Sequence, residues 1–139
     1  MLEEKLKHLE FIQNAINRMN ANSFQIKGWM ITITAALLAI FASTKNADFV
    51  IVAIFPTAIF WLLDTYYLTQ ERRFRGLYND VAGVTDNPEP IKSFEMRIKE
   101  YTGGEYSYWR VLTSKTILTL HLFVIIALGV LYTILKIIN

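Results

Sequence analysis

The chain has 139 residues, of which 53% are hydrophobic and 19% are charged, and its mean hydropathy of +0.31 is unusual for a small soluble domain and excludes a disordered chain. Fourteen Lys and Arg against twelve Asp and Glu leave a net charge of +2, so no nucleic-acid partner is expected. The absence of Cys excludes disulfides and thiolate metal sites.

The first predicted element is a cytoplasmic amphipathic helix over residues 1–27. Its mostly apolar stripe recurs at spacings of three and four and consists of Leu9, Ile12, Ile16, Met19, Ser23 and Ile26, with Leu2 and Leu6 extending it. Neighbouring subunits are the expected cover for this stripe, and lying flat on the membrane is the other way to bury it. Four neutral amides lie off the stripe: Gln13, Asn14, Asn17 and Asn20. They suit the lining of a hydrated pore or, equally, a solvated helix face.

Three apolar blocks follow, at residues 28–44, 49–68 and 116–135. A helix of ~20 residues spans a hydrocarbon core of ~30 Å. We therefore predict transmembrane helices over 28–44, 49–68 and 109–138, with an outer turn at 45–48. Gly28 is a candidate bend before the first of them. A cleaved signal peptide fits poorly, so these segments should be retained.

The placement of basic residues predicts the orientation. Only Lys45 and Lys136 lie on the side of the outer turn and the C-terminus, and the other twelve lie in residues 1–27 or 69–115. By the positive-inside rule, the N-terminus is cytoplasmic and the C-terminus is outside. Trp29, Trp61 and Trp109 stand near the cytoplasmic ends of the three helices, as membrane-interface anchors do.

The segment between the second and third membrane helices is also expected in the cytoplasm. Helical spacing continues over residues 69–82, which predicts a helix that packs against residues 1–27 as a stalk. Residues 83–108 are a linker or hairpin, in which alternation at Phe94, Met96 and Ile98 favours a strand slightly over a short helix. The predicted fold is thus a single all-α membrane domain with long cytoplasmic extensions and a strand-like or irregular segment before the third helix.

Two ionisable residues lie inside the apolar blocks. Asp64 costs ~2.5–3.5 kcal/mol in lipid unless it is paired, and we predict an intramembrane ion pair with Lys115 in preference to a permeation site; Arg72 and Lys27 are also within reach. His121 is a candidate pore-lining, pH-sensitive group, although a hydrogen bond to a Thr or carbonyl between helices is the stronger interpretation.

Arg72, Arg73 and Arg75 follow the second membrane helix at once, where basic residues contact anionic lipid headgroups. Catalysis has little support, because the only histidines, His8 and His121, are far apart and no phosphate loop, nucleophile elbow or metal-ligand cluster occurs. We therefore expect no enzyme and no cofactor.

The run from His8 to Tyr78 resembles the RipA-type family of small octameric bacterial membrane proteins. The segments that carry the resemblance are HLEFIQNAINRMNANSFQIKGWMITITAALLAIFA and FWLLDTYYLTQERRFRGLY, followed by FEMR and SYWRVLTSKTIL. The resemblance covers most of the chain in order, as an overall pattern without a single signature. The matching positions include Trp61, Asp64, Tyr67, Glu71, Arg72, Arg75 and Tyr78.

The resemblance implies a homo-octameric ring in the bacterial inner membrane. It also implies kinship with the membrane accessory protein of type VI-B CRISPR systems, which opens a pore in antiviral defence. Asp64, Tyr67, Glu71 and Tyr78 would then share a subunit-contact face of one helix. The ribonuclease-like motif attached to the CRISPR relatives is missing here, which argues against a nuclease role.

Three functions compete at this point. The first is a ring that forms or gates a membrane pore, in phage defence or envelope stress. The second is a non-conducting scaffold that presents its stalk to a cytoplasmic protein partner. The third is similar to the two-helix effectors that accompany nucleotide-signalling defence modules, but the chain carries no recognisable ligand-binding domain for such a signal.

Overall fold

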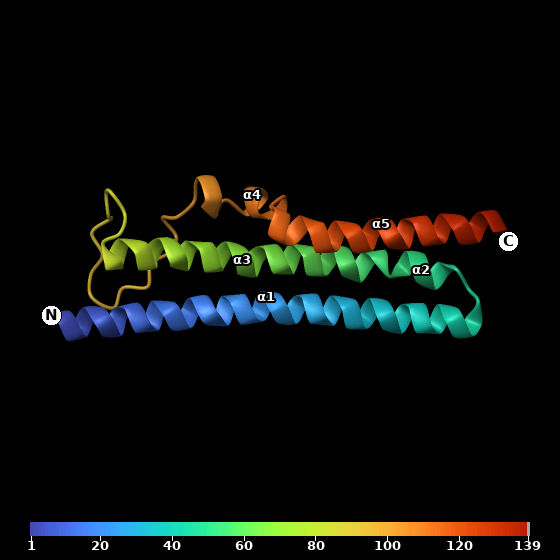
Figure 1. Ribbon diagram of the computed structural model, residues 1–139, viewed down its shortest axis with the longest axis horizontal. Helices are drawn as coiled ribbons and strands as arrows, with labels where there is room; N and C mark the ends of the chain where they lie inside the picture. Colours follow the sequence, from blue (N-terminus) through green and yellow to red (C-terminus); the bar gives the residue numbers. More distant parts are fainter. Residues whose placement is uncertain (139) are drawn as a thin grey trace.

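Helix α1 (Leu2–Thr44) runs the whole length of the molecule in the computed structural model, which describes residues 1–138. The remaining helices are α2 (Asp48–Val52), α3 (Ile54–Ala82), a 3₁₀ turn η1 (Gly104–Tyr106), α4 (Tyr108–Leu112) and α5 (Lys115–Ile138). The N-terminus and the end of α5 lie at opposite ends of the long axis (Figure 1). The irregular segment 83–103 lies near the N-terminal end of α1.

Helix α1 does not bend at Gly28, so the candidate break there is wrong. A single internal glycine costs about 1 kcal/mol relative to Ala, which is small for a helix that is held by packing on both sides of the position. The helix ends where Lys45 takes a left-handed conformation (φ 59°) and its N–H bonds the Phe41 carbonyl. This termination allows the tight reversal into α2.

The second apolar block forms two helices where one was predicted. The break falls at Ala53, between α2 and α3. Pro56 explains it, because proline has no N–H to donate and its ring clashes with the carbonyl four residues earlier, at Val52. Helix α3 then continues to Ala82 and ends at Gly83, whose positive φ of 78° lets its N–H bond the Asn79 and Asp80 carbonyls.

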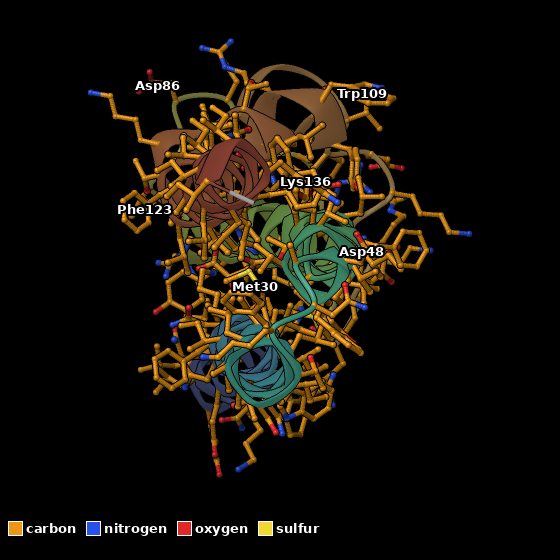
Figure 2. All side chains as sticks on the ribbon, turned by 90° about the vertical axis from the view of Figure 1, so that its right-hand side faces the viewer. Met30, Asp48, Asp86, Trp109, Phe123 and Lys136 are labelled. Carbon is orange, nitrogen blue, oxygen red and sulfur yellow. The ribbon has the colours of Figure 1, made fainter. Side chains whose placement is uncertain are left out.

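The long helices form one layer, with α3 between α1 and α5. Contacts join α1 to α3, α3 to α5, and α2 to both α1 and α5, but none joins α1 to α5 within residues 1–138. The view along the long axis shows the three positions in a row (Figure 2). Segment 83–103 crosses this layer near the N-terminal end of α1, where it packs against α1 and α3.

The all-helical class and three helices long and apolar enough to cross a membrane are confirmed; these are α1, the joined α2–α3 unit, and α5. The predicted strand is wrong, since residues 83–103 are irregular and no strand forms anywhere in the described chain. Phe94 has a φ of 61°, which is incompatible with an extended strand. The predicted helix 109–138 is likewise broken at Thr113 and Ser114, between α4 and α5.

The stalk, defined here as residues 2–27 of α1 and 69–82 of α3, has its own hydrophobic core. Ile12, Ile16 and Leu77 are buried at its centre. Partly buried side chains complete the cluster, namely Phe74, Tyr78, Val81, Ile91, Ile98 and Tyr101. Segment 83–103 thus helps α3 to cover the apolar stripe of α1. The part of the stripe from Leu9 to Ile26 is thus buried or partly buried within one subunit, whereas Leu2 and Leu6 stay exposed.

Candidate functional site

The polar centre of the molecule is Asp64, which joins all three long helices. Its side chain is fully buried in α3. From α1, the Ser23 hydroxyl donates to Oδ1, and the Lys27 ammonium lies 2.8 Å from Oδ1 and 2.6 Å from Oδ2. From α5, Nε2 of His121 lies 3.7 Å from Oδ2. Asp64 of α3 is thus a polar link between the two outer helices, α1 and α5.

The ion-pair partner of Asp64 is Lys27, and the predicted partner Lys115 is wrong. Lys115 is the exposed first residue of α5 and forms no ion pair within residues 1–138. Lys27 lies one turn beyond Ser23 on the α1 face that packs on α3, whereas Lys115 precedes His121 by six residues, more than a turn and a half of helix. The rotation and register of the helices thus select Lys27.

His121 is fully buried, which contradicts its assignment to a pore lining. Its Nδ1 lies 2.9 Å from the Ile117 carbonyl of the same helix, rather than a group on a neighbouring helix. Trp61 of α3 stacks on the imidazole with ring centroids 6.4 Å apart and donates Nε1–H to the Leu112 carbonyl at the end of α4. Trp61 therefore positions the imidazole of His121 and also stabilises the chain where α4 ends before α5.

The other two tryptophans are free of such contacts with the core. Trp29 and Trp109 are 52% and 73% exposed, as a side chain that anchors a helix at the membrane interface needs to be. Trp61 is only half-buried, and its role in the structure is the contact with His121.

The four amides predicted to line a pore, Gln13, Asn14, Asn17 and Asn20, are all exposed on α1, and Gln13 donates to Asn17 at 3.0 Å. At about 100° per residue, three of them project within about 60° of one another around α1, together with three exposed apolar residues. We call this set the uncharged face; it consists of Leu2, Leu6, Gln13, Asn17, Asn20 and Phe24. No charged residue falls within it, and Asn14 lies outside it, about 60° around the helix from Asn17, its nearest member.

The basic cluster after the apolar part of α3 binds protein groups. Arg72 and Arg73 donate to the Glu105 and Tyr106 carbonyls at 3.4 Å, which ties η1 to α3. Arg75 pairs with Glu71 one turn earlier. The headgroup contacts stay a prediction, and two of the three guanidinium groups, those of Arg72 and Arg73, have a structural role within the subunit.

The predicted subunit-contact face is wrong for two of its four residues. Asp64 is fully buried and Glu71 is 5% exposed, so both point into the subunit. Tyr67 and Tyr78 are half-buried, and Tyr78 packs on the stalk core. The four residues do share one side of α3, but that side packs within the subunit, so it is not a free surface for a neighbour.

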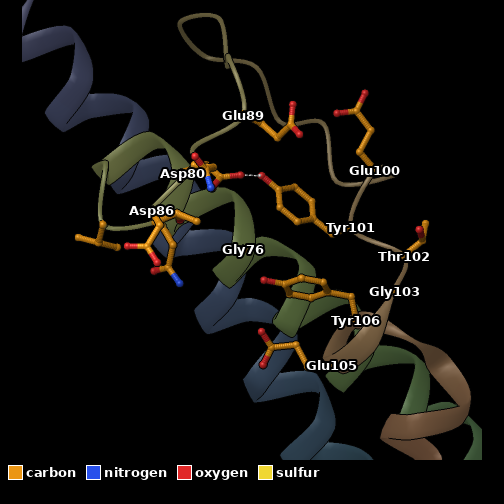
Figure 3. Close-up of a pocket in the computed structure, with 14 residues that line it drawn as sticks. Gly76, Asp80, Asp86, Glu89, Glu100, Tyr101, Thr102, Gly103, Glu105 and Tyr106 are labelled. Carbon is orange, nitrogen blue, oxygen red and sulfur yellow. Dashed lines mark hydrogen bonds between the residues drawn. The ribbon is translucent and has the colours of Figure 1, made fainter.

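A second polar region is a cavity of about 680 Å³ beside α3, under segment 83–106 (Figure 3). Its carboxylates are Asp80, Asp86, Glu89, Glu100 and Glu105, and no Lys or Arg lines it. Tyr101 and Tyr106 form its floor over Gly76, and the Tyr101 hydroxyl donates to Asp80 at 2.5 Å. The sequence missed this region because its residues come from three separate segments.

Tyr101 should ionise only at strongly alkaline pH. Burial and the hydrogen bond to Asp80 raise its pKa well above the ordinary value near 10. A raised pKa favours the neutral phenol in the folded state, so the stability it contributes is complete below pH ~10 and is lost above it. In a spectrophotometric titration, Tyr101→Phe should remove the latest phenolate signal. An unchanged titration curve would contradict this assignment.

Gly76 lets the two tyrosines approach α3. A Cβ at this position would lie 2.7 Å from Cδ1 of Tyr101 and 2.9 Å from the Tyr106 hydroxyl. Gly76→Ala should therefore lower the free energy of unfolding by about 1–3 kcal/mol, the usual cost of overpacking. Gly28→Ala is the matched control, because nothing lies within 4 Å there and an alanine should stabilise the helix by about 0.5–1 kcal/mol. Chemical denaturation of both variants tests the opposite signs.

No group of His, Asp and Glu within residues 1–138 is arranged to hold a metal ion. No protein family, curated protein or solved structure matches the chain in the three comparisons made with known proteins.

Proposed function

We propose that the protein assembles with copies of itself in the bacterial inner membrane into a ring that forms or gates a pore. The observation that carries the proposal is the uncharged face of α1. It extends over 23 residues of the stalk, outside the apolar block, and exposes Leu2, Leu6 and Phe24. Apolar side chains in water favour a protein contact, and amides between them can hydrogen-bond across a helix pair.

In this arrangement the α1 helices face the ring axis and contact their neighbours through the uncharged face. Separation of the copies would expose Gln13, Asn17 and Asn20 as an uncharged, hydrated lining, whereas Asn14 projects outside it. The resemblance to the RipA-type family supplies eight as the expected number of copies. The layer supports a ring geometry, because α1 stands at one edge of it with the uncharged face free for neighbours.

The proposal predicts that one charge on the uncharged face will disrupt assembly. Wild-type protein in mild detergent should give a native mass spectrum dominated by a multiple of 16.1 kDa, with eight copies expected. Asn20→Glu should shift it to the monomer, because repeated like charges would meet at the axis. Gln25→Glu is the control, since Gln25 is exposed on the opposite side of α1. A monomeric wild-type protein would refute the proposed ring.

A non-conducting membrane scaffold is the second candidate, and the closed stalk core favours it. Because α3 and segment 83–103 already cover the apolar stripe of α1, the stalk can stand alone and present a surface to a cytoplasmic protein. Dye release from vesicles that contain the protein separates the two candidates. Release that changes in Asn17→Leu supports the pore, whereas tight vesicles carrying assembled protein support the scaffold.

A further inference from the structure

One buried nitrogen has no partner in the cluster around Asp64. Nε2 of His121 makes no hydrogen bond and has essentially no exposed surface. It lies 3.7 Å from Oδ2 of Asp64, an oxygen that also has no hydrogen-bond donor beyond its ion-pair contact with Lys27. An unpaired polar atom in a buried site is costly and calls for an explanation.

The other ring nitrogen fixes the tautomer of the imidazole. Nδ1 lies 2.9 Å from the Ile117 carbonyl, which can only accept a hydrogen bond, so Nδ1 carries the proton. In the neutral ring Nε2 is then a bare acceptor. It faces a carboxylate oxygen, and two acceptors that face each other at this distance repel.

A proton is the ligand that satisfies both atoms. A water molecule that bridges two acceptors holds them more than 4 Å apart, given ordinary hydrogen-bond lengths of about 2.8 Å, so the 3.7 Å gap is too short for one. A metal cation would meet the Lys27 ammonium, which is 2.6 Å from the same oxygen. We propose that Asp64 and His121 form an intramembrane proton-binding site, in which Nε2 takes up a proton and donates it in a hydrogen bond to Oδ2.

The charges around the ring define what proton binding does. Asp64 of α3 faces His121 directly, and Lys27 of α1 lies behind the carboxylate. Of the other neighbours of α5, the start of α2 carries Asp48, which pairs with Lys136 at the far end, and α4 carries Arg110, which is exposed. A protonated imidazole is therefore a second cation for the same carboxylate, in competition with Lys27.

Lys27 can yield its place because its side chain is 21% exposed and reaches water. Asp64 then pairs with His121 of α5 in place of Lys27, and the pair stays neutral, while the Ser23 hydroxyl of α1 still donates to Oδ1. The site is complete within one chain, so this inference stands apart from the proposed ring and pore. Acidification would loosen the polar contact between α1 and α3 and strengthen the one between α3 and α5.

The direct test is ¹⁵N NMR of histidine-labelled, full-length protein in lipid nanodiscs. The His121→Gln variant assigns the signals, since the only other histidine is His8. As the sample is acidified from about pH 8, the His121 ring should pass from the Nδ1–H tautomer to the doubly protonated form. A neutral Nε2–H tautomer at the start, or a ring that stays neutral throughout, would overturn the proposal.

Two substitutions should move this titration in opposite directions. Asp64→Asn removes the carboxylate that holds the proton, so half-saturation should move to lower pH. Lys27→Gln removes the competing cation, so half-saturation should move to higher pH. Shifts of the same sign, or none, would mean that the ring does not share its proton with Asp64. If Asp64→Asn does not fold, the unmodified protein and Lys27→Gln still decide the question.

Discussion

Lys27→Met should lower the free energy of unfolding by about 3–5 kcal/mol, the usual cost of removing one partner of a buried ion pair. The substitution leaves the Asp64 carboxylate fully buried, with the Ser23 hydroxyl as its one remaining donor. Methionine has a side chain of similar length and keeps the packing of α1 on α3. The loss of stability therefore measures the removal of the positive charge. The measurement is equilibrium unfolding in mixed micelles, followed by helical circular dichroism.

Two control variants make this result specific. Lys115→Met should have almost no effect, because Lys115 is exposed and forms no ion pair in the described chain. Asp64→Asn should cost less than Lys27→Met, since the 21% exposed ammonium can turn to water while the amide keeps the Ser23 hydrogen bond. Equal losses for Lys27→Met and Lys115→Met would refute the assignment of the pair.

Leu77→Ala should destabilise the protein by about 2–5 kcal/mol, as large-to-small changes in a core do. Leu77 is fully buried between Ile12 and Ile16 of α1 and the side chains of segment 83–103. The substitution would leave a cavity in the stalk core, where α1, α3 and segment 83–103 meet. Movement of one of these segments alone cannot fill that cavity. A protease should then cut segment 83–103 first, because Ile91, Ile98 and Tyr101 of this segment pack against the stalk core.

Leu6→Ala is the matched control, because Leu6 is 58% exposed on the uncharged face. Its effect on the unfolding of one subunit should be within about 0.5 kcal/mol, as for most surface changes. A large loss for Leu6→Ala in monomeric protein, or none for Leu77→Ala, would show that the stalk core lies elsewhere.

The sequence was a good guide to the helices and a poor one to the segment between them. Apolar blocks of about 20 residues indicate membrane-length helices through local composition alone, and three such helices are confirmed. Alternation at Phe94, Met96 and Ile98 suggested a strand. The backbone there is instead irregular, with Phe94 in a left-handed conformation. The Phe94 ring contacts His8 and Phe11 of α1.

The polar site was only half visible in the sequence. Asp64 and His121 were recognisable as ionisable residues inside apolar blocks, which makes them conspicuous one at a time. Their burial and shared contact were not recognisable, and the assignments of Lys115 as a partner and of His121 as a lining residue followed from depth alone. The tyrosine-floored cavity gave no local signal, because Gly76, Asp80 and Tyr101 meet only after the chain reverses.

The sequence by itself determined that this is an all-helical protein with three apolar helices, because hydropathy and helix length are properties of contiguous residues. The tertiary structure alone decided that α3 lies between α1 and α5, and that Lys27, Asp64 and His121 come together. Ion pairing depends on the rotation and axial register of each helix against its neighbour. Rotation and register are set by packing between side chains that are far apart in the chain, such as the buried Ser23 of α1 and Asp64 of α3.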